Sequence, residues 1–485
     1  MITARAFEGR HYAVYGVARS GLATVEALLA SGARVTAWDI REDARSSLRA
    51  KLVGTGTAAE GSWGGVGADP TTIESSFDGP PPRASHREEL TIADLDTADL
   101  TEFDSLIVTP GLPLNRHPIA ERAREAGVEI IGDIELFARA RPELPPHKVV
   151  GITGTNGKST TTALVHHILK TAGVPAAMGG NIGLPILAQD PLPEGGVYVL
   201  ELSSYQIDLT QSLDCDVAVL LNITPDHLDR YGSFDAYAAS KARLFAMQSD
   251  AHASVISDGP GTADTVDTWS SRFPARDLLY ATTGYEDIWA ASVVMDEATW
   301  QHELFAYQNE WPALQGPHNA ENAACAISAC SALGISLETI AEGLKTYPGL
   351  PHRMERIRER QGVLFVNDSK ATNPTATAPA LAAFPSIRWI LGGQAKTDNL
   401  DECAPHFAHV RSAYTIGEAG ELFARLLEPH MPVHECNTLE NAVNRAAKDS
   451  QPGDTVLLSP ACASFDQFTD FEQRGDRFRE LVGAL

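Results

Sequence analysis

Apolar runs of strand length alternate along this chain with segments whose apolar residues recur at helical spacing. Near the start, an apolar run at 11–17 leads through a Gly-rich turn to a helical pattern at 22–30 and a second strand pattern at 34–38. This order predicts a β-turn-α-β unit. The same part of the chain predicts strands at 105–109 and 128–131 and a helix at 117–126.

The alternation starts again at Lys148 and a third time after residue 351. The second series predicts strands at 149–153, 197–202 and 217–223 and helices at 159–172, 319–333 and 337–346. The third predicts strands at 363–367, 389–391 and 455–458 and a final helix from Phe471. Because strands alternate with helices throughout, we expect an α/β protein with parallel, doubly wound sheets.

Two proline-containing segments, at 140–147 and 347–351, separate the three series. They predict domains at 1–141, 142–349 and 350–485, which agrees with a 485-residue chain at about 150 residues per domain. A stretch at 54–91 is rich in Gly, Pro and Ser and lacks periodicity. We expect it to form a surface loop or a partly disordered insertion.

Composition narrows the classes of function. The chain has 38 Lys and Arg against 63 Asp and Glu, a net charge of −25, which opposes binding to nucleic acid or to an anionic membrane. The six cysteines form no C-x-x-C pair, so we expect neither a disulfide scaffold nor a zinc site, but a reducing cytoplasm. The sequence shows no signal-peptide pattern and no apolar run that approaches the roughly 18 residues of a membrane span, so no membrane insertion is expected.

The strongest local motif is GITGTNGKST at 151–160, which follows a predicted strand and opens a predicted helix. Backbone N–H groups of such a turn, together with the helix N-terminus, form a nest for phosphate oxygens. Lys158 would neutralise the β- and γ-phosphates and Ser159 would ligate Mg²⁺. The strict P-loop template lacks its first glycine, which would fall on Ile152. The alternative is an ordinary Gly-rich turn.

Three further polar residues follow or adjoin the central strands. Glu201 ends the apolar strand at 197–202, where a carboxylate would face a ligand crevice or form a strand-end salt bridge. His227 follows the strand at 217–223, as a metal ligand or a structural histidine. Lys241 lies in a predicted helix, where the residues alone indicate a solvated lysine.

Polar loops also follow strands in the outer domains. GVARSG at 16–21 is a weak dinucleotide fingerprint, and Asp39 ends the next strand as a ribose or base acceptor, or as a helix cap. In the third domain, polar loops at 367–374, 391–396 and 459–466 each follow a strand and together predict a composite ligand site. Cys462 has no histidine partner in view and is interpreted as a small loop residue.

These motifs together resemble the Mur ligases, ATP-dependent amide-forming ligases of peptidoglycan precursor synthesis. TGTNGKST (153–160), GPHN (316–319) and NDSKATN (367–373) carry the resemblance to the family. Its D-glutamate-adding branch is indicated by GDIELF (132–137), GGNIG (179–183), ELSSYQID (201–208), DHLDRYGS (226–233), LPHRMER (350–356) and SPACASFDQFTDFEQRG (459–475).

The resemblance implies a Rossmann-like N-terminal domain for the UDP-substrate, a central P-loop-type ATPase domain, and a Rossmann-like C-terminal domain that closes on ATP and binds D-glutamate. It also implies a reaction in which the carboxylate of UDP-N-acetylmuramoyl-L-alanine attacks ATP. The acyl phosphate formed is then attacked by the amine of D-glutamate. The cofactors implied are ATP and two Mg²⁺ ions, and the protein is expected to be a cytoplasmic monomer.

The resemblance also assigns roles to single residues. The catalytic set would be Lys158, Glu201, His227 and Lys241, and Lys241 would be carbamylated. The metal ligands would be Ser159, Glu201, His227 and the carbamate of Lys241. ATP would contact Gly154, Thr155, Asn156, Gly157, Lys158, Ser159, Thr160, Asn319, Asn322, Arg353 and Asp368. The UDP-substrate would contact Arg19, Ser20, Asp39, Thr109, Pro110, Gly111 and Asn181. D-glutamate would contact Lys370, Thr372, Lys396, Ser464, Phe465 and Phe471.

Two loops depart from the family pattern. GVARSG replaces the more familiar G-L-G-x-[ST]-G, and Gln394-Ala395 stands where Asp-Gly is common. Two other functions stay open. A ligase of the same superfamily that adds a different amino acid would share the ATPase motifs, although the D-N-P-R motif of the diaminopimelate branch is absent. A P-loop NTPase switch would explain 148–160 but not the polar loops of the third domain.

Overall fold

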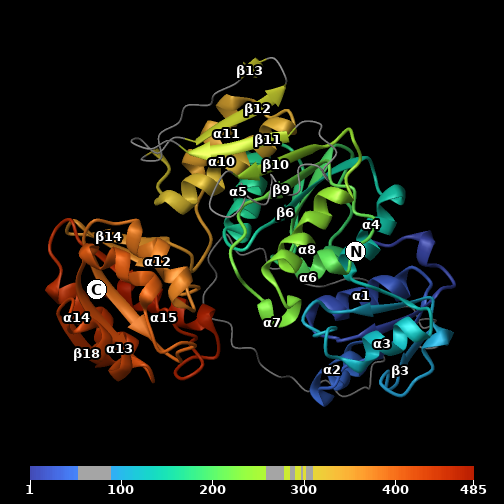
Figure 1. Cartoon of the computed structure of the whole chain (residues 1–485), viewed down its shortest axis with the longest axis horizontal. Coiled ribbons are helices and arrows are strands. Elements are labelled where there is room, and N and C mark those ends of the chain that lie inside the picture. Colours follow the sequence, from blue (N-terminus) through green and yellow to red (C-terminus); the bar gives the residue numbers. More distant parts are fainter. Residues whose placement is uncertain (53–88, 258–277, 284–289, 297–298, 302–309) are drawn as a thin grey trace.

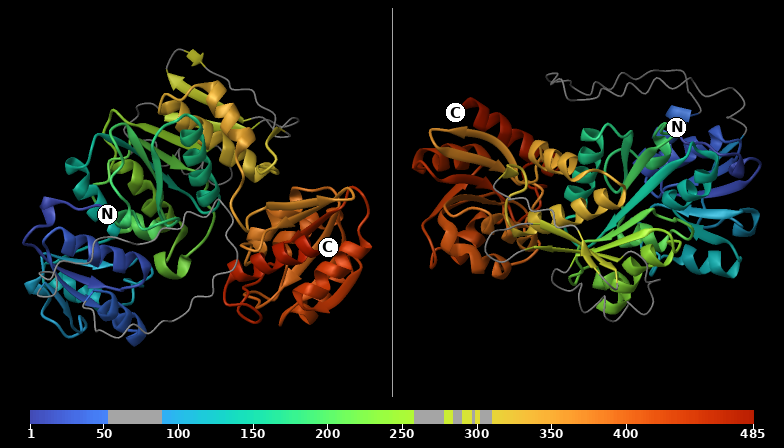
Figure 2. Two further views of the ribbon diagram at one scale, coloured as in Figure 1. Left: turned by 180° about the vertical axis from the view of Figure 1, so that it is seen from behind. Right: turned by 90° about the horizontal axis from the view of Figure 1, so that it is seen from above.

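The computed structural model describes residues 1–52, 89–257, 278–283, 290–296, 299–301 and 310–485. Most of the insertion expected at 54–91 therefore lies outside the described residues. The described chain builds three β-sheets, one after another along the sequence, and we name the N-terminal, central and C-terminal domains after them. Figures 1 and 2 show the central domain between the other two.

The N-terminal sheet has the strand order β3-β2-β1-β4-β5, and its described pairings are all parallel. Its strands are β1 (His11–Tyr15), β2 (Arg34–Trp38), β3 (Leu90–Ile92), β4 (Ser105–Val108) and β5 (Glu129–Ile131). Its helices are α1 (Arg19–Ala30), α2 (Glu42–Leu52), α3 (Pro118–Glu125) and α4 (Asp133–Ala140). The strand order reverses between β1 and β4, and in such sheets ligands bind at the carboxyl ends of the strands on either side of the reversal.

The central sheet has the order β13-β12-β11-β10-β9-β6-β8-β7. Its strands are β6 (His147–Thr153), β7 (Ala176–Gly180), β8 (Gly196–Glu201), β9 (Val217–Leu220), β10 (Ala253–Ser257), β11 (Leu278–Thr283), β12 (Ala290–Asp296) and β13 (Thr299–Gln301). Its helices are α5 (Lys158–Thr171), α6 (Ser204–Asp208), α7 (Leu228–Tyr231), α8 (Phe234–Ala246), α10 (Pro317–Ala332) and α11 (Leu337–Thr346). Every residue of β8 and β9 is buried, which is typical of parallel strands covered by helices on both faces.

The C-terminal sheet has the order β14-β15-β19-β16-β17-β18. Its strands are β14 (Glu355–Arg360), β15 (Val363–Asn367), β16 (Ile387–Gly392), β17 (Val410–Ile416), β18 (Val433–Asn437) and β19 (Thr455–Leu458). Its helices are α12 (Pro374–Ala382), α13 (Gly420–Leu427), α14 (Leu439–Asp449) and α15 (Phe471–Ala484). The strands predicted at 363–367 and 455–458 match β15 and β19 residue for residue.

The sheets are parallel, as expected, except at two edges. β12 pairs antiparallel with β11 on one side and with β13 on the other, and β14 pairs antiparallel with β15. Only Gln361 and Gly362 connect β14 to β15, and both have positive φ, 53° and 74°. Two such residues form the tight turn of a hairpin, whereas a parallel connection needs a dozen or more residues. The charged sequence ERIRER hid this edge strand from an apolar pattern.

The N-terminal and central domains share one hydrophobic core. A single cluster of buried residues contains Val14 and Phe137 from the first domain and Tyr198 and Leu220 from the second. The two core clusters beneath the C-terminal sheet consist of residues from Val363 onward. The first two domains therefore form one packed body, and the third has a core of its own. Among the described helices, none is long and apolar enough to cross a lipid bilayer.

Candidate functional site

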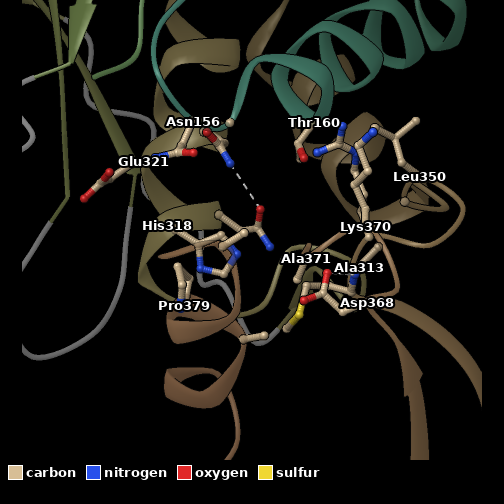
Figure 3. Close-up of a pocket in the computed structure, with 18 of the residues that line it drawn as sticks. Asn156, Thr160, Ala313, His318, Glu321, Leu350, Asp368, Lys370, Ala371 and Pro379 are labelled. Carbon is tan, nitrogen blue, oxygen red and sulfur yellow. Dashed lines mark hydrogen bonds between the residues drawn. The ribbon is translucent and has the colours of Figure 1, made fainter. Parts of the chain in front are cut away.

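Two pockets lie where the domains meet. The first, shown in Figure 3, is lined by Asn156, Thr160 and His318 from the central domain and by Asp368 and Lys370 from the C-terminal domain. Gly157, Asn319, Asn322 and Arg353 line it as well. The second is lined by residues of all three domains: Arg19, Thr155, Asn156, Gly157, Lys158, Ser159, Asn181, Glu201, Arg353, Lys370 and Phe471. Residues separated by hundreds of positions thus surround one continuous region, as the loops at strand ends predict.

The Gly-rich loop between β6 and α5 forms the floor of this region. Gly157 has φ +83° and caps α5, and a Cβ there would lie 2.1 Å from Asn322 Oδ1. Gly154 has φ +154°, and a Cβ there would lie 3.0 Å from the Leu221 Cβ. Both positions need glycine, because L-residues avoid this backbone conformation and no space is left for a side chain. The start of α5 at Lys158 leaves its first N–H groups directed at the loop.

Cationic side chains gather around the loop. Lys158 Nζ donates to the carbonyl oxygens of Gly154 at 2.9 Å and Thr155 at 2.7 Å. Arg353 Nη2 donates to Ser159 Oγ at 3.0 Å, which joins the C-terminal domain to α5. Burial lowers the pKa of both cations. Among the described residues, no carboxylate is hydrogen-bonded or ion-paired to either of these half-buried cations, which indicates a place for an anionic ligand.

Lys241 is fully buried, so the interpretation as a solvated lysine is wrong. Its Nζ donates to Gly154 O at 2.8 Å and lies 4.6 Å from the centre of the Tyr237 ring. Burial, reinforced by the charge of Lys158, holds the pKa of Lys241 well below its ordinary value. α8 is capped by Ser233, whose Oγ accepts from the Ala236 amide, and this start brings Lys241 to the underside of the Gly-rich loop.

Glu201 has an unused oxygen. Its Oε1 accepts from Asn181 Nδ2 at 3.1 Å, while Oε2 is buried and has no hydrogen-bond partner within the described residues. An orphaned carboxylate oxygen beside Ser159 suits a divalent cation, because Mg²⁺ binds hard oxygen ligands. The donor chemistry at this point therefore fits the Mg²⁺ that the resemblance implies.

His227 lines neither pocket. It has φ 52°, its side chain is 45% exposed, and its Nε2 lies 3.4 Å from Asp226 Oδ2. Its ring is 4.9 Å from Tyr205 and 6.2 Å from Tyr237, whose hydroxyl is 3.2 Å from Thr155 Oγ1. In the described part of the chain, no three His, Cys, Asp or Glu side chains are close enough to hold a metal ion together.

The nucleotide candidates lie in the pocket of Figure 3. Asn322 Nδ2 donates to Asn319 Oδ1 at 3.2 Å, so α10 presents both amides as one unit. Burial raises the pKa of Asp368 to about 7. The hydrogen bonds from Ser459 Oγ and the Met354 amide favour the carboxylate and lower the pKa, but their effect is smaller than that of burial. His318 was overlooked, although GPHN contains it: burial lowers its pKa to about 4, so a neutral imidazole lines the pocket.

The residues expected at the UDP-substrate separate into two groups. Arg19 and Asn181 line the three-domain pocket, whereas Ser20, Thr109 and Pro110 line a smaller one between β1 and β4. Asp39 accepts from the amides of Val17 at 2.9 Å and Arg41 at 3.0 Å. Burial raises the pKa of Asp39, and these bonds reverse the shift, so the net pKa is below its ordinary value. Gly111 lies at the surface of the same turn.

The residues expected at D-glutamate are brought together only in part. Lys370 lines both pockets, with its Nζ 3.8 Å from the centre of the Phe471 ring. Lys396 Nζ is 3.5 Å from Thr372 Oγ1. Ser464 is buried, and neither it nor Phe465, whose side chain is 67% exposed, lines the pockets.

A buried arginine that sequence reasoning left without a role holds these loops together. Arg474 Nε donates to Ser369 Oγ at 2.9 Å, and its Nη2 donates to the carbonyl oxygens of Ser369 at 2.8 Å and Cys462 at 3.1 Å. Burial lowers its pKa to about 10. Burial also raises the pKa of the Cys462 thiol to about 12, which fits a small loop residue and not a nucleophile.

Comparison with known proteins shows the family to which this chain is related. Residues 152–330 match the model of the Mur ligase middle domain, and residues 352–462 match that of the Mur ligase glutamate ligase domain. A protein named "UDP-N-acetylmuramoylalanine--D-glutamate ligase" from Novosphingobium aromaticivorans is 57% identical over 100% of this chain and 97% of its own length. Proteins of the same name from Sphingopyxis alaskensis and Zymomonas mobilis are 53% and 51% identical, each over 100% of both chains.

Solved structures share the fold. The UDP-N-acetylmuramate-alanine ligase MurC of Thermotoga maritima aligns with a TM-score of 0.54 and 17% identity, over 98% of this chain and 99% of its own. MurF of the same organism, in complex with ADP, aligns with a TM-score of 0.53 and 18% identity, over 76% and 92%. At these identities the likeness concerns the arrangement of the elements.

Proposed function

This chain belongs to the Mur ligase family, and from that premise we propose that it is an ATP-dependent ligase that joins D-glutamate to UDP-N-acetylmuramoyl-L-alanine. The product serves the synthesis of peptidoglycan precursors. One arrangement supports this function above the others: the Gly-rich loop, the orphaned oxygen of Glu201 and Lys370 of the C-terminal domain border a single pocket. A ligase needs nucleotide, acid and amine to meet at such a place.

The reaction has two steps. An oxygen of the substrate carboxylate attacks the γ-phosphorus of ATP, the bond to the β-phosphate oxygen breaks, and ADP leaves. The amine of D-glutamate then attacks the acyl carbon and loses a proton, and the tetrahedral intermediate releases phosphate to give the amide. Negative charge spreads over the transferring oxygens, so positioned cations accelerate the first step. Lys158 and Arg353, both half-buried and lining the same pocket as Ser159, are placed to supply that charge.

The metal-binding role would fall to four residues. Mg²⁺, two ions in the family, would neutralise the phosphates and orient the carboxylate. Ser159 and Glu201 would hold it, together with His227 and a carbamate on Lys241. Carbamylation needs a neutral amine, and burial lowers the pKa of Lys241 in the required direction. The other nucleotide contacts would be the remaining residues of the Gly-rich loop, with Asn319, Asn322 and Asp368 in the neighbouring pocket.

The outer domains would hold the other substrates. The segment 1–141, with a Rossmann-like sheet order, would bind the UDP-substrate through Arg19, Ser20, Asp39 and the turn 109–111, with Asn181 nearer the muramoyl-alanine. The segment 350–485, also Rossmann-like, would bind D-glutamate, whose carboxylates Lys370 and Lys396 would meet. Thr372, Ser464, Phe465 and Phe471 would complete this site, and the segment 142–349 would bind ATP. The enzyme would act as a monomer in the cytoplasm.

The test is phosphate release from ATP with UDP-N-acetylmuramoyl-L-alanine and a panel of D-Glu, L-Glu, L-Lys, meso-diaminopimelate and L-Ala. We expect release that depends on both the UDP-substrate and D-Glu. Dependence on a different amino acid would move the chain to another branch of the family, and release without any amino acid would favour an NTPase switch. Lys158→Ala should abolish turnover, whereas Lys170→Ala, an exposed lysine on the same helix, should retain it.

A further inference from the structure

The short helix that follows His227 is fastened to the N-terminal domain. Arg230 Nη1 donates to Pro110 O at 3.2 Å. Asn115 Nδ2 donates to the carbonyl oxygens of Asp229 at 3.3 Å and Arg230 at 3.2 Å. Figure 1 shows α7 extending from the central domain toward the N-terminal domain. The turn that contains Pro110 is the one assigned above to the UDP-substrate. The turn proposed for the substrate is therefore in contact with the helix that follows His227, the proposed metal ligand.

Arg230 also reaches His227 through an aromatic ring. Its guanidinium carbon lies 3.7 Å from the centre of the Tyr205 ring, within range of a cation–π interaction. The Tyr205 ring is in turn 4.9 Å from the His227 ring. One side chain therefore connects the Pro110 turn to the ring that His227 contacts. Lysine would not reproduce this, because only the planar guanidinium stacks on a ring and donates in its plane at once.

His227 depends on such support. Its φ of 52° lies in the left-handed region, which costs a non-glycine residue about 1 kcal/mol or more and persists only where the surroundings hold it. Among the described residues, the carboxylate close to a nitrogen of its ring is that of Asp226, in the same loop, 3.4 Å from Nε2. The position of His227 is thus set by its contacts with Tyr205 and Tyr237, and Tyr205 is held by Arg230.

We propose that Arg230 is a positioning residue that couples binding of the UDP-substrate at the Pro110 turn to the placement of His227 for divalent-cation binding. The inference rests on the proposed function, which assigns the turn to the substrate and His227 to the metal. Substrate bound at the turn would fix Pro110 O in its contact with Arg230, and Arg230 and Tyr205 would hold the imidazole in place. By linkage, a bound cation should tighten the binding of the UDP-substrate by the same factor.

The experiment measures Mn²⁺ affinity by electron paramagnetic resonance on the ADP complex of the full-length protein. The probe is UDP-N-acetylmuramoyl-L-alaninamide, in which a neutral amide replaces the reacting carboxylate and so removes the carboxylate as a metal ligand. In the wild-type protein we expect a saturating concentration of the amide to tighten Mn²⁺ binding about fivefold or more. In Arg230→Met the factor should fall below about twofold, both for Mn²⁺ affinity when the amide is bound and for amide affinity when Mn²⁺ is bound.

Two further variants keep the result interpretable. Asn115→Asp replaces the amide that donates to α7 with a group that cannot donate, and it should also reduce the coupling. Arg124→Met removes an exposed arginine of α3 in the same domain and should leave the coupling intact. Full coupling in Arg230→Met, or no coupling in an active wild-type enzyme, would overturn the positioning role alone. A wild-type protein that makes no product from the true substrates would instead overturn the proposed function.

Discussion

At the scale of single residues, burial of cations distinguishes the site. The chain carries a net charge of −25, yet the buried Lys241 and the half-buried Lys158 and Arg353 lie together around one loop. Burial lowers the pKa of each, because water no longer solvates the charge. Such an arrangement is costly in the free protein, and phosphate groups would offset the cost by pairing with the cations. A local basic pocket in an acidic protein is what an anionic ligand requires.

The role of Lys241 can be tested by chemical rescue. Lys241→Ala should lower turnover about 100-fold or more, because it removes a group that organises charge at the reaction centre. Short carboxylic acids should restore part of the activity by standing in for the carbamate. In the wild-type protein, ¹³CO₂ should give a carbamate signal in ¹³C NMR that the variant lacks. Full activity without added acid in Lys241→Ala would refute the carbamate.

Asp368 should make nucleotide use depend on pH. Its pKa of about 7 in the folded protein means that below pH 7 the carboxyl is neutral and loses an acceptor for Ser459 or the Met354 amide. We therefore expect kcat/KM for ATP to fall as the pH drops through about 7, approaching tenfold per unit. Asp368→Asn should be slower at high pH and lack this inflection. An unchanged inflection in the variant would assign it to another group.

The same shift predicts an effect on stability. The pKa of Asp368 is higher in the folded protein than in an unfolded chain, so the folded state holds its proton more tightly. Stability from this group is therefore greatest at low pH and is lost as the pH rises from about 4 to about 7. The Tm of Asp368→Asn minus that of the wild-type protein should therefore be larger at pH 8 than at pH 5.5. A constant difference between the two proteins at both pH values would contradict this.

At the scale of elements, the two ends of α5 provide a matched pair of glycines. Gly157 precedes the helix and Gly173 follows it, and both have positive φ, 83° and 72°. A Cβ at Gly157 would meet Asn322 Oδ1 at 2.1 Å, whereas nothing lies within 4 Å of one at Gly173. An alanine would therefore strain the backbone at both positions, but only at Gly157 would its Cβ clash with α10.

We expect Gly157→Ala to raise the KM for ATP about tenfold or more, because Asn322 and the loop must shift. Gly173→Ala should cost about 1–2 kcal/mol of stability from strain alone and leave the KM for ATP unchanged. Steady-state kinetics and thermal unfolding of both variants separate the two effects. Equal KM values in the two alanine variants would show that the close approach of Asn322 does not matter for binding.

At the scale of the whole molecule, the cores suggest which part moves. The N-terminal and central domains share one buried cluster, and Glu135 of α4 reinforces their contact by accepting from the amides of Gln211 at 2.7 Å and Ser212 at 2.9 Å. The C-terminal domain has separate cores and reaches the Gly-rich loop through Arg353. We therefore expect the C-terminal domain to move relative to the other two domains.

Ligand binding should therefore compact the protein. An acyl phosphate must be kept from water, so a site divided between domains has to close during the reaction. We expect small-angle X-ray scattering to show a smaller radius of gyration with nucleotide and UDP-substrate together than without them. Arg353→Ala, which removes the contact with Ser159, should reduce this compaction. An unchanged radius of gyration in the wild-type protein would argue against closure.

The sequence alone determined the alternation of strands and helices along much of the chain, the Gly-rich loop and the family. These features rest on local patterns: apolar spacing sets an element, and glycine positions set a turn. It missed the edge strand β14, because strand identity there comes from the hairpin turn and not from burial.

Only the tertiary structure decided the electrostatic state and the partners of particular side chains. Lys241 is buried against Gly154, 87 positions away, Arg474 joins Ser369 to Cys462, and Arg230 joins Pro110 to Tyr205. Desolvation and hydrogen bonding depend on which distant segments pack together. The spacing of residues along the chain does not contain that information. For this reason the sequence predicts a solvated Lys241, whereas the fold buries it.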